Sequence, residues 1–183
     1  MITPIIIATF ILAAHAATSW QYEDANRGAA IPTPPFPNAQ LKFKLRGSQT
    51  NNFISVIELD FLEAGPGNHL HTREDEFYYV LDGQVQFMIN GTQFCGKTGD
   101  YVYVPRLMSR AVRVHNPTHA KKRVRMQIAL FPAGVEGFLE DIAVYFIQGH
   151  NNQTLSDEIS RKYGLRNLEP VIWEDLGCFQ TSR

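Results

Sequence analysis

The sequence contains only two cysteines, no excess of either charge and a single long apolar run. With 17 basic and 18 acidic residues the formal net charge is -1, so the composition indicates neither a nucleic-acid partner nor an acidic substrate attracted over a distance. A chain of 183 residues fits one domain and can bury a core without disulfide staples. These features indicate one globular domain. Because composition and charge do not indicate a function, the function has to be inferred from local motifs.

The one apolar run covers residues 5–14 and is followed by Ala14-His15-Ala16, an A-x-A cleavage pattern. A run this short is typical of a secretory signal peptide and is too short to span a bilayer. We therefore predict that residues 1–16 are a signal peptide and that the mature protein is secreted, with no membrane attachment after cleavage. An uncleaved anchor or an N-terminal β-strand is the alternative.

Secretion affects the interpretation of the cysteines and of two sequons. In an oxidising compartment two cysteines more often pair than stay free, so we predict a Cys95–Cys178 disulfide that ties the C-terminal tail to the domain. Two separate buried thiols are the alternative. Asn90 and Asn152 begin N-x-S/T sequons in predicted turns and are candidate glycosylation sites.

Alternation of apolar and polar residues begins near residue 40, after a proline-rich stretch from Ala30 to Pro37. We predict that residues 17–39 are an extended lead-in and that residues 40–132 form a β-domain. Asp82-Gly83 and Asn90-Gly91 are hairpin turn signals within it. The predicted strands cover residues 41–45, 53–62, 77–81, 84–89, 101–104, 110–115 and 123–131. Short strands at even spacing are typical of a sandwich or a closed barrel.

Helical periodicity appears only in residues 133–183, which we expect to pack on the barrel as helices and a tail. One helix is predicted over residues 135–146 and a second over residues 155–163, where Gly164 provides a natural stop. The predicted fold class is therefore all-β with short C-terminal helices.

Three residues have the types and spacing of a metal site. His69 and His71 are two apart, so on a strand both rings project from one face, and Glu76 begins the next predicted strand. Two imidazoles and one carboxylate that converge in a barrel mouth form the donor set of non-haem iron and of other first-row divalent metals. Two surface histidines in a loop are the alternative, but the later glycines Gly83 and Gly99 continue a more specific pattern.

Five strings carry a family resemblance: HLHTREDE at 69–76, FYYVLDG at 77–83, GDYVYVP at 99–105, VHNPT at 114–118 and FPAG at 131–134. They resemble the cupin superfamily, and within it the single-domain cupins related to quercetin 2,3-dioxygenase. The resemblance implies a single antiparallel jelly-roll β-barrel, often a homodimer, with His69, His71 and Glu76 as metal ligands. The implied cofactor is one divalent ion of iron, manganese, nickel, cobalt or copper.

The second cupin motif departs from the family at two positions. Leu107 and Arg110 stand where the resemblance implies a turn glycine and a further ligand histidine. On an extended strand Arg110 shares an inward face with Val114, whereas His115 points outward. An inward guanidinium would repel a divalent cation and offer Glu76 a partner, so we expect an ion pair in place of the metal. The alternative is that Arg110 extends out of the barrel mouth and leaves a three-ligand site.

Three kinds of function follow. With a metal, the resemblance implies a quercetinase-like dioxygenase acting on a flavonol or other enol, with Glu76 as ligand and general base. Without one, a pocket lined by Arg110, Tyr78 and Phe87 suits a small anion, a sugar acid or a phenol, although Tyr78 and Phe87 fit the barrel core equally well. Extracellular matrix and storage proteins also occur among cupins. We predict a secreted cupin that binds a small-molecule ligand and holds a metal weakly or not at all.

Overall fold

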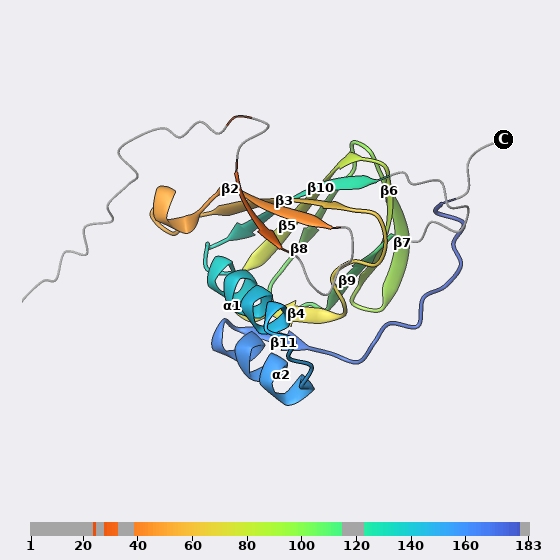
Figure 1. The fold of residues 1–183 in the computed structure, drawn as a ribbon. Helices are drawn as coiled ribbons and strands as arrows, with labels where there is room; N and C mark the ends of the chain where they lie inside the picture. Colours follow the sequence, from red (N-terminus) through yellow and green to blue (C-terminus); the bar gives the residue numbers. More distant parts are fainter. Residues whose placement is uncertain (1–23, 25–27, 33–38, 115–122, 180–183) are drawn as a thin grey trace, which may run out of the picture.

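The computed structural model describes residues 24, 28–32, 39–114 and 123–179, which form two β-sheets followed by two helices (Figure 1). The strands are β1 (Ala29–Pro32), β2 (Gln40–Leu45), β3 (Ser55–Phe61), β4 (His69–His71), β5 (Asp75–Asp82), β6 (Gln84–Ile89), β7 (Thr92–Lys97), β8 (Tyr101–Val104), β9 (Arg110–Arg113), β10 (Val124–Phe131) and β11 (Leu165–Asn167). The helices are the 3-10 helix η1 (Gly47–Gln49), α1 (Glu136–Ile147) and α2 (Gln153–Lys162).

All the paired strands run antiparallel, and the strand order shows that the chain crosses repeatedly between the sheets. One sheet has the order β1-β2-β3-β10-β5-β8, and the other has the order β11-β4-β9-β6-β7. Neighbours far apart in sequence, such as β3 and β10, are the mark of a jelly roll rather than of a meander. The predicted fold class, an all-β jelly roll with short C-terminal helices, is confirmed.

The core lies between the two sheets, and strands of the six-stranded sheet bury one face against it. Along β3 and β10 every second side chain is buried, and these include Leu59 and Met126. Tyr78 of β5 and Phe87 of β6 come from opposite sheets, and their ring centroids lie 5.5 Å apart. Both side chains are almost completely buried, so they join the two inner faces into one core.

Two of the turns follow directly from their residues. Asn90 and Gly91 connect β6 to β7 with φ angles of 49° and 84°, which is the geometry of a two-residue hairpin turn. Gly164 follows α2 with a φ of 82° and ends that helix as predicted. At the other end of α2, the Asn152 side chain accepts a hydrogen bond from the Leu155 N–H, so it caps the helix.

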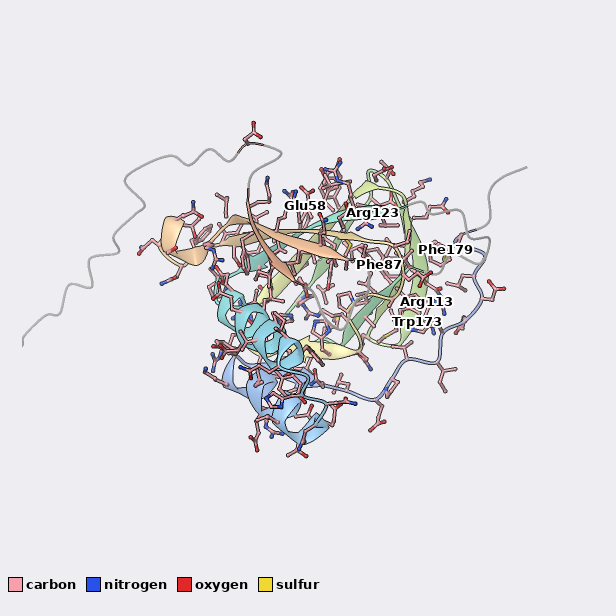
Figure 2. All side chains as sticks on the ribbon, in the orientation of Figure 1. Glu58, Phe87, Arg113, Arg123, Trp173 and Phe179 are labelled. Carbon is pink, nitrogen blue, oxygen red and sulfur yellow. A yellow bond between two sulfur atoms is a disulfide. The ribbon has the colours of Figure 1, made fainter. Side chains whose placement is uncertain are left out.

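The C-terminal tail after β11 runs along the outside of the five-stranded sheet (Figure 1). Cys178 is bonded to Cys95 of β7, which confirms the predicted disulfide. The Arg113 guanidinium lies 4.9 Å from the Trp173 ring, and Figure 2 shows this pair where the tail crosses the sheet. The Gln86 amide donates to the Glu174 carbonyl, so the tail covers side chains that would otherwise face solvent.

The structure differs from the predicted elements mainly at the sheet edges. Residues 29–32 form the edge strand β1, within the segment that was predicted to be an extended lead-in. An edge strand can include Pro32, which lacks the N–H that a central strand would need for pairing. β7 and β11 were not predicted, since β7 is mostly polar and β11 is only three residues long. The predicted signal peptide, residues 1–16, and His115 lie outside the described residues.

No helix in the described part of the chain is long and apolar enough to cross a membrane. Asn90 and Asn152, the two sequon asparagines, are both exposed. Glycosylation at either position stays a prediction.

Candidate functional site

A cavity of about 460 Å³ lies between the six-stranded sheet and the two helices. Its walls are mainly apolar, with leucine and isoleucine side chains from the strands and a row of apolar side chains from α1. The wall residues from α1 are Phe138, Leu139, Ile142, Ala143 and Phe146. Asn68, His69, His71 and Glu76 form a polar group on the wall, called here the polar end.

Two strands from different sheets bring the histidines and the glutamate of the polar end together. His69 and His71 alternate with Leu70 on β4, so both rings face the cavity as their spacing predicts. Glu76 lies near the start of β5 in the other sheet. Donor atoms of His69, His71 and Glu76 all lie within 4.8 Å of one another, so the predicted convergence of these three residues is confirmed.

Arg110 is fully buried and completes this cluster from β9, where it pairs in register with His69. Its Nη1 donates to Glu76 Oε2 at 2.8 Å. Its other donors are directed to main-chain carbonyls: Nη2 to Pro105 at 2.8 Å and to Met108 at 3.0 Å, and Nε to Met108 at 3.2 Å. The predicted ion pair is confirmed, and the alternative in which Arg110 extends into solvent is wrong.

Glu74 is a buried residue of this site that the sequence interpretation missed. One of its oxygens lies 3.1 Å from His71 Nδ1, while His71 Nε2 lies 3.6 Å from Glu76 Oε2. Both ring nitrogens of His71 therefore face carboxylates, and Glu74 fixes the orientation of the ring. Glu74 stands two residues before Glu76, so the two-residue period of an extended chain could have identified it as inward-facing.

His69 has a different environment on each side of its ring. Its Nδ1 lies 2.7 Å from the Gly67 carbonyl, so Nδ1 carries the proton and donates it. Burial lowers the pKa of His69 to about 4, and the neighbouring His71 lowers it further than burial alone would. The ring is therefore neutral at physiological pH, and Nε2 keeps its lone pair.

Glu76 and Tyr78 are perturbed by the same cluster. Burial alone would raise the pKa of Glu76, but His71, His69 and Arg110 outweigh it and hold the pKa below its usual range. Burial and the adjacent Glu76 carboxylate raise the pKa of Tyr78 well above its usual range. Glu76 is thus a carboxylate and Tyr78 a neutral phenol at neutral pH.

The residues present fit a tightly held divalent metal poorly. Two imidazoles and a carboxylate are suitable donors, and the Glu74–His71 contact resembles the carboxylate support that metal-binding histidines commonly have. However, Glu76 Oε2 already accepts a hydrogen bond from Arg110. A cation among these donors would lie next to a permanent positive charge, which lowers its affinity.

The other predicted pocket residues do not line the cavity. Tyr78 and Phe87 lie in the hydrophobic core, so the interpretation of them as ligand-pocket residues is wrong and the core alternative holds. Arg110 lies behind Glu76 instead of on the cavity wall, since its hydrogen bonds hold it among the β8–β9 loop carbonyls. Arg110 is therefore not placed on the cavity wall, where it was expected to attract an anionic ligand. The helix α1 provides the wall that these residues were expected to provide.

Comparison with known proteins gives a family and a fold. Residues 59–124 match the family model described as Cupin domain. No curated protein matches the chain by sequence. KdgF from Halomonas sp. is similar at 16% identity and a TM-score of 0.51, over 62% of this chain and 94% of that one.

Two further solved structures resemble the chain with similar identities and TM-scores. A Streptomyces PAC13 variant with uridine has 13% identity and a TM-score of 0.52, over 84% of this chain and 94% of that one. A predicted oxalate decarboxylase from Thermotoga maritima has 15% identity and a TM-score of 0.53, over 61% and 99%. Identities this low support the fold alone. The narrower resemblance to quercetin 2,3-dioxygenase relatives stays a prediction.

The antiparallel strand order, the grouping of His69, His71 and Glu76 and the family match to residues 59–124 agree with one another. Residues 59–124 therefore match the cupin domain, and the strands around them have the fold of a cupin jelly roll.

Proposed function

We propose that this protein is a secreted cupin that binds an apolar small molecule in its barrel cavity and holds a metal ion weakly or not at all. The buried Arg110–Glu76 ion pair carries the proposal, because it engages the carboxylate that a metal would need. The protein then uses the cupin barrel for binding instead of for metal-dependent oxidation.

The cavity supports the binding part of the proposal. Its volume of about 460 Å³ lies within the range of pockets that hold drug-sized molecules. Most of its wall is apolar and includes side chains of β2, β3, β10 and α1, so removing an apolar ligand from water would supply most of the affinity. The polar end would then fix the orientation of the ligand rather than provide the binding energy.

Secretion is the second part of the proposal. The Cys95–Cys178 disulfide supports it, since disulfides form and persist mainly in oxidising compartments. Glycans at Asn90 and Asn152, and a homodimer, are further predictions of the same assignment.

The binding proposal can be tested by filling the cavity. Ile142 and Val144 lie on the same helix, but Ile142 lines the cavity whereas Val144 is exposed to solvent. We expect the wild type and Val144→Trp to bind the neutral fluorophore N-phenyl-1-naphthylamine alike. Ile142→Trp should bind it at least about tenfold more weakly, because the indole occupies the ligand space.

Fluorescence titration measures the three affinities, and circular dichroism checks that each variant is folded. Equal affinities in all three proteins would place the fluorophore elsewhere. No binding by the wild type would overturn the proposal.

A metal-dependent dioxygenase is the second candidate, and one observation favours it. The donor atoms of His69, His71 and Glu76 lie within 4.8 Å of one another, and Glu74 supports His71 as a metal ligand would require. This candidate predicts near-stoichiometric metal and oxygen consumption with a flavonol such as quercetin. The binding proposal predicts neither.

A further inference from the structure

The polar end of the cavity offers hydrogen-bond acceptors, because the nearby donors are already engaged. Arg110 directs Nη1 to Glu76 and Nη2 and Nε to the carbonyls of Pro105 and Met108. It lies behind the carboxylate and presents no donor along the cavity wall. Although a buried arginine lies in the cluster, the ligand would not meet it.

The histidines divide into one that is engaged and one that is open. Both nitrogens of His71 face carboxylates, at 3.1 Å to Glu74 and 3.6 Å to Glu76. His69 donates its Nδ1 proton to the Gly67 carbonyl at 2.7 Å, which leaves Nε2 as an acceptor on the cavity wall. His69 is thus the imidazole that a ligand can use.

Asn68 places a second acceptor without a partner beside His69. Its Nδ2 donates to the Glu169 carbonyl at 2.8 Å, which assigns the other amide atom as the oxygen. That oxygen is buried and has no hydrogen-bond partner among the described residues, although Asn68 lines the cavity. A buried acceptor without a partner is costly, so a donor from a bound molecule would relieve it.

We infer that the ligand is a neutral molecule with an apolar body and a terminal hydroxyl group, an alcohol or a phenol, which donates its hydrogen bond at the Asn68–His69 side of the polar end. This inference rests on the proposed binding function. The hydroxyl supplies the donor that His69 Nε2 lacks, beside the unpartnered oxygen of Asn68, and the apolar body lies along α1 and the strands β2, β3 and β10.

The two charged alternatives fit less well. A carboxylic acid would bring a carboxylate toward Glu76, which Arg110 already pairs with, and Arg110 itself does not lie on the cavity wall. An alkylammonium would donate well but would lose its hydration in a cavity with mainly apolar walls, and Arg110 already pairs with Glu76. A hydroxyl avoids both costs.

A matched ligand series tests the inference on the wild-type protein. Decan-1-ol, decyl methyl ether, decanoate and decylamine share one chain and differ in the head group. Each is titrated against the bound fluorophore N-phenyl-1-naphthylamine. We expect decan-1-ol to displace it with an affinity about tenfold higher than that of the ether, since only the alcohol can donate.

Replacing His69 should remove this preference. In His69→Leu we expect the alcohol and the ether to bind within about twofold of each other. His150→Leu, the same substitution at an exposed histidine outside the cavity wall, should keep the wild-type preference. Tightest binding of decanoate or decylamine would overturn the inference.

Equal displacement by all four molecules would also overturn it but would leave the proposed apolar binding intact. A preference for the alcohol that persists in His69→Leu would overturn the assignment of His69 as the acceptor. If the wild type bound neither the fluorophore nor any member of the series, the proposed function would fail, and this inference with it.

Discussion

A single residue, Arg110, separates this site from a cupin metal centre. It stands where the family resemblance implies a histidine, and the fold brings its guanidinium within 2.8 Å of the Glu76 carboxylate. Since both side chains are buried, each depends on the other for its charge balance. With Arg110 the site already contains a positive charge beside Glu76. A histidine at this position would leave that charge to be supplied by a metal ion.

Restoring the histidine should restore metal binding. In Arg110→His the guanidinium is lost and an imidazole faces Glu76, so we expect tight binding of a divalent transition metal and melting that becomes sensitive to chelator. Without metal the same variant should lose about 3–5 kcal/mol of stability, because Glu76 stays buried without its partner. Elemental mass spectrometry and thermal melts with and without chelator measure both effects.

The matched control is Arg166→His, at an exposed arginine on β11. It should change neither metal content nor melting. Unchanged metal content in Arg110→His would show that Arg110 is not what keeps the metal out.

Leu107 carries backbone strain at the second departure from the family motif. It has a φ of 66° and a largely exposed side chain, while its N–H donates to the His71 carbonyl. A glycine keeps that hydrogen bond and adopts this φ freely, so Leu107→Gly should raise the free energy of unfolding by about 1 kcal/mol. Leu176→Gly, at an exposed leucine without a positive φ, should not stabilise the protein.

Urea denaturation of the two variants tests this prediction. A loss of stability in Leu107→Gly as large as that in Leu176→Gly would argue against strain at this turn.

Asp75 provides a pH-dependent contribution to stability. Hydrogen bonds from the Arg106 side chain and backbone lower its pKa to about 2. Because the folded pKa lies below the unfolded value of about 3.9, the stabilisation is present above pH ~4 and is lost as the pH falls toward 2. Asp75→Asn should therefore cost less than about 1 kcal/mol at neutral pH, given the exposure of the pair, and almost nothing near pH ~2.

Urea denaturation of Asp75→Asn and the wild type at several pH values follows the difference between them. A difference that stays constant from neutral to strongly acidic pH would contradict the assignment.

At the scale of elements, the sequence predicted the strands that alternate and missed those that do not. Every second residue from Val124 to Leu130 is apolar and buried, and β10 forms there as predicted. β7 was missed because it is polar and faces a tail that reaches it only through tertiary structure. The convergence of β4, β5 and β9 at the site followed from motif spacing, but the choice between an ion pair and an extended Arg110 needed the three-dimensional packing of the β8–β9 loop.

The C-terminal tail is the element whose attachment can be measured. The Cys95–Cys178 bond closes a loop with a sequence separation of 83 residues. In the chain-entropy model a loop of this size stabilises the fold by about 4 kcal/mol, so the double variant Cys95→Ser, Cys178→Ser should lose an amount of that order. Comparing it in urea with reduced wild type separates loss of the bond from loss of the thiols, and equal stability of all forms would contradict the prediction.

For the whole molecule, the sequence was sufficient for the jelly-roll class and for His69, His71 and Glu76, and it was insufficient for the cavity. α1 was predicted as a helix, but no local pattern places its apolar face opposite the six-stranded sheet to enclose about 460 Å³. Tyr78 and Phe87 were misassigned for the same reason, since an inward side chain can face either the core or a cavity. The position of the cavity depends on how α1 packs against strands that are far from it in the sequence.

The central claim is that the Arg110–Glu76 pair stands in place of a metal ion, and the metal content of the protein tests it most directly. The measurement is elemental mass spectrometry on the protein, purified without a histidine tag or chelator. We predict a folded protein with far less than one equivalent of iron, manganese, nickel, cobalt or copper. Near-stoichiometric content of any one of these metals would contradict the claim and favour the dioxygenase.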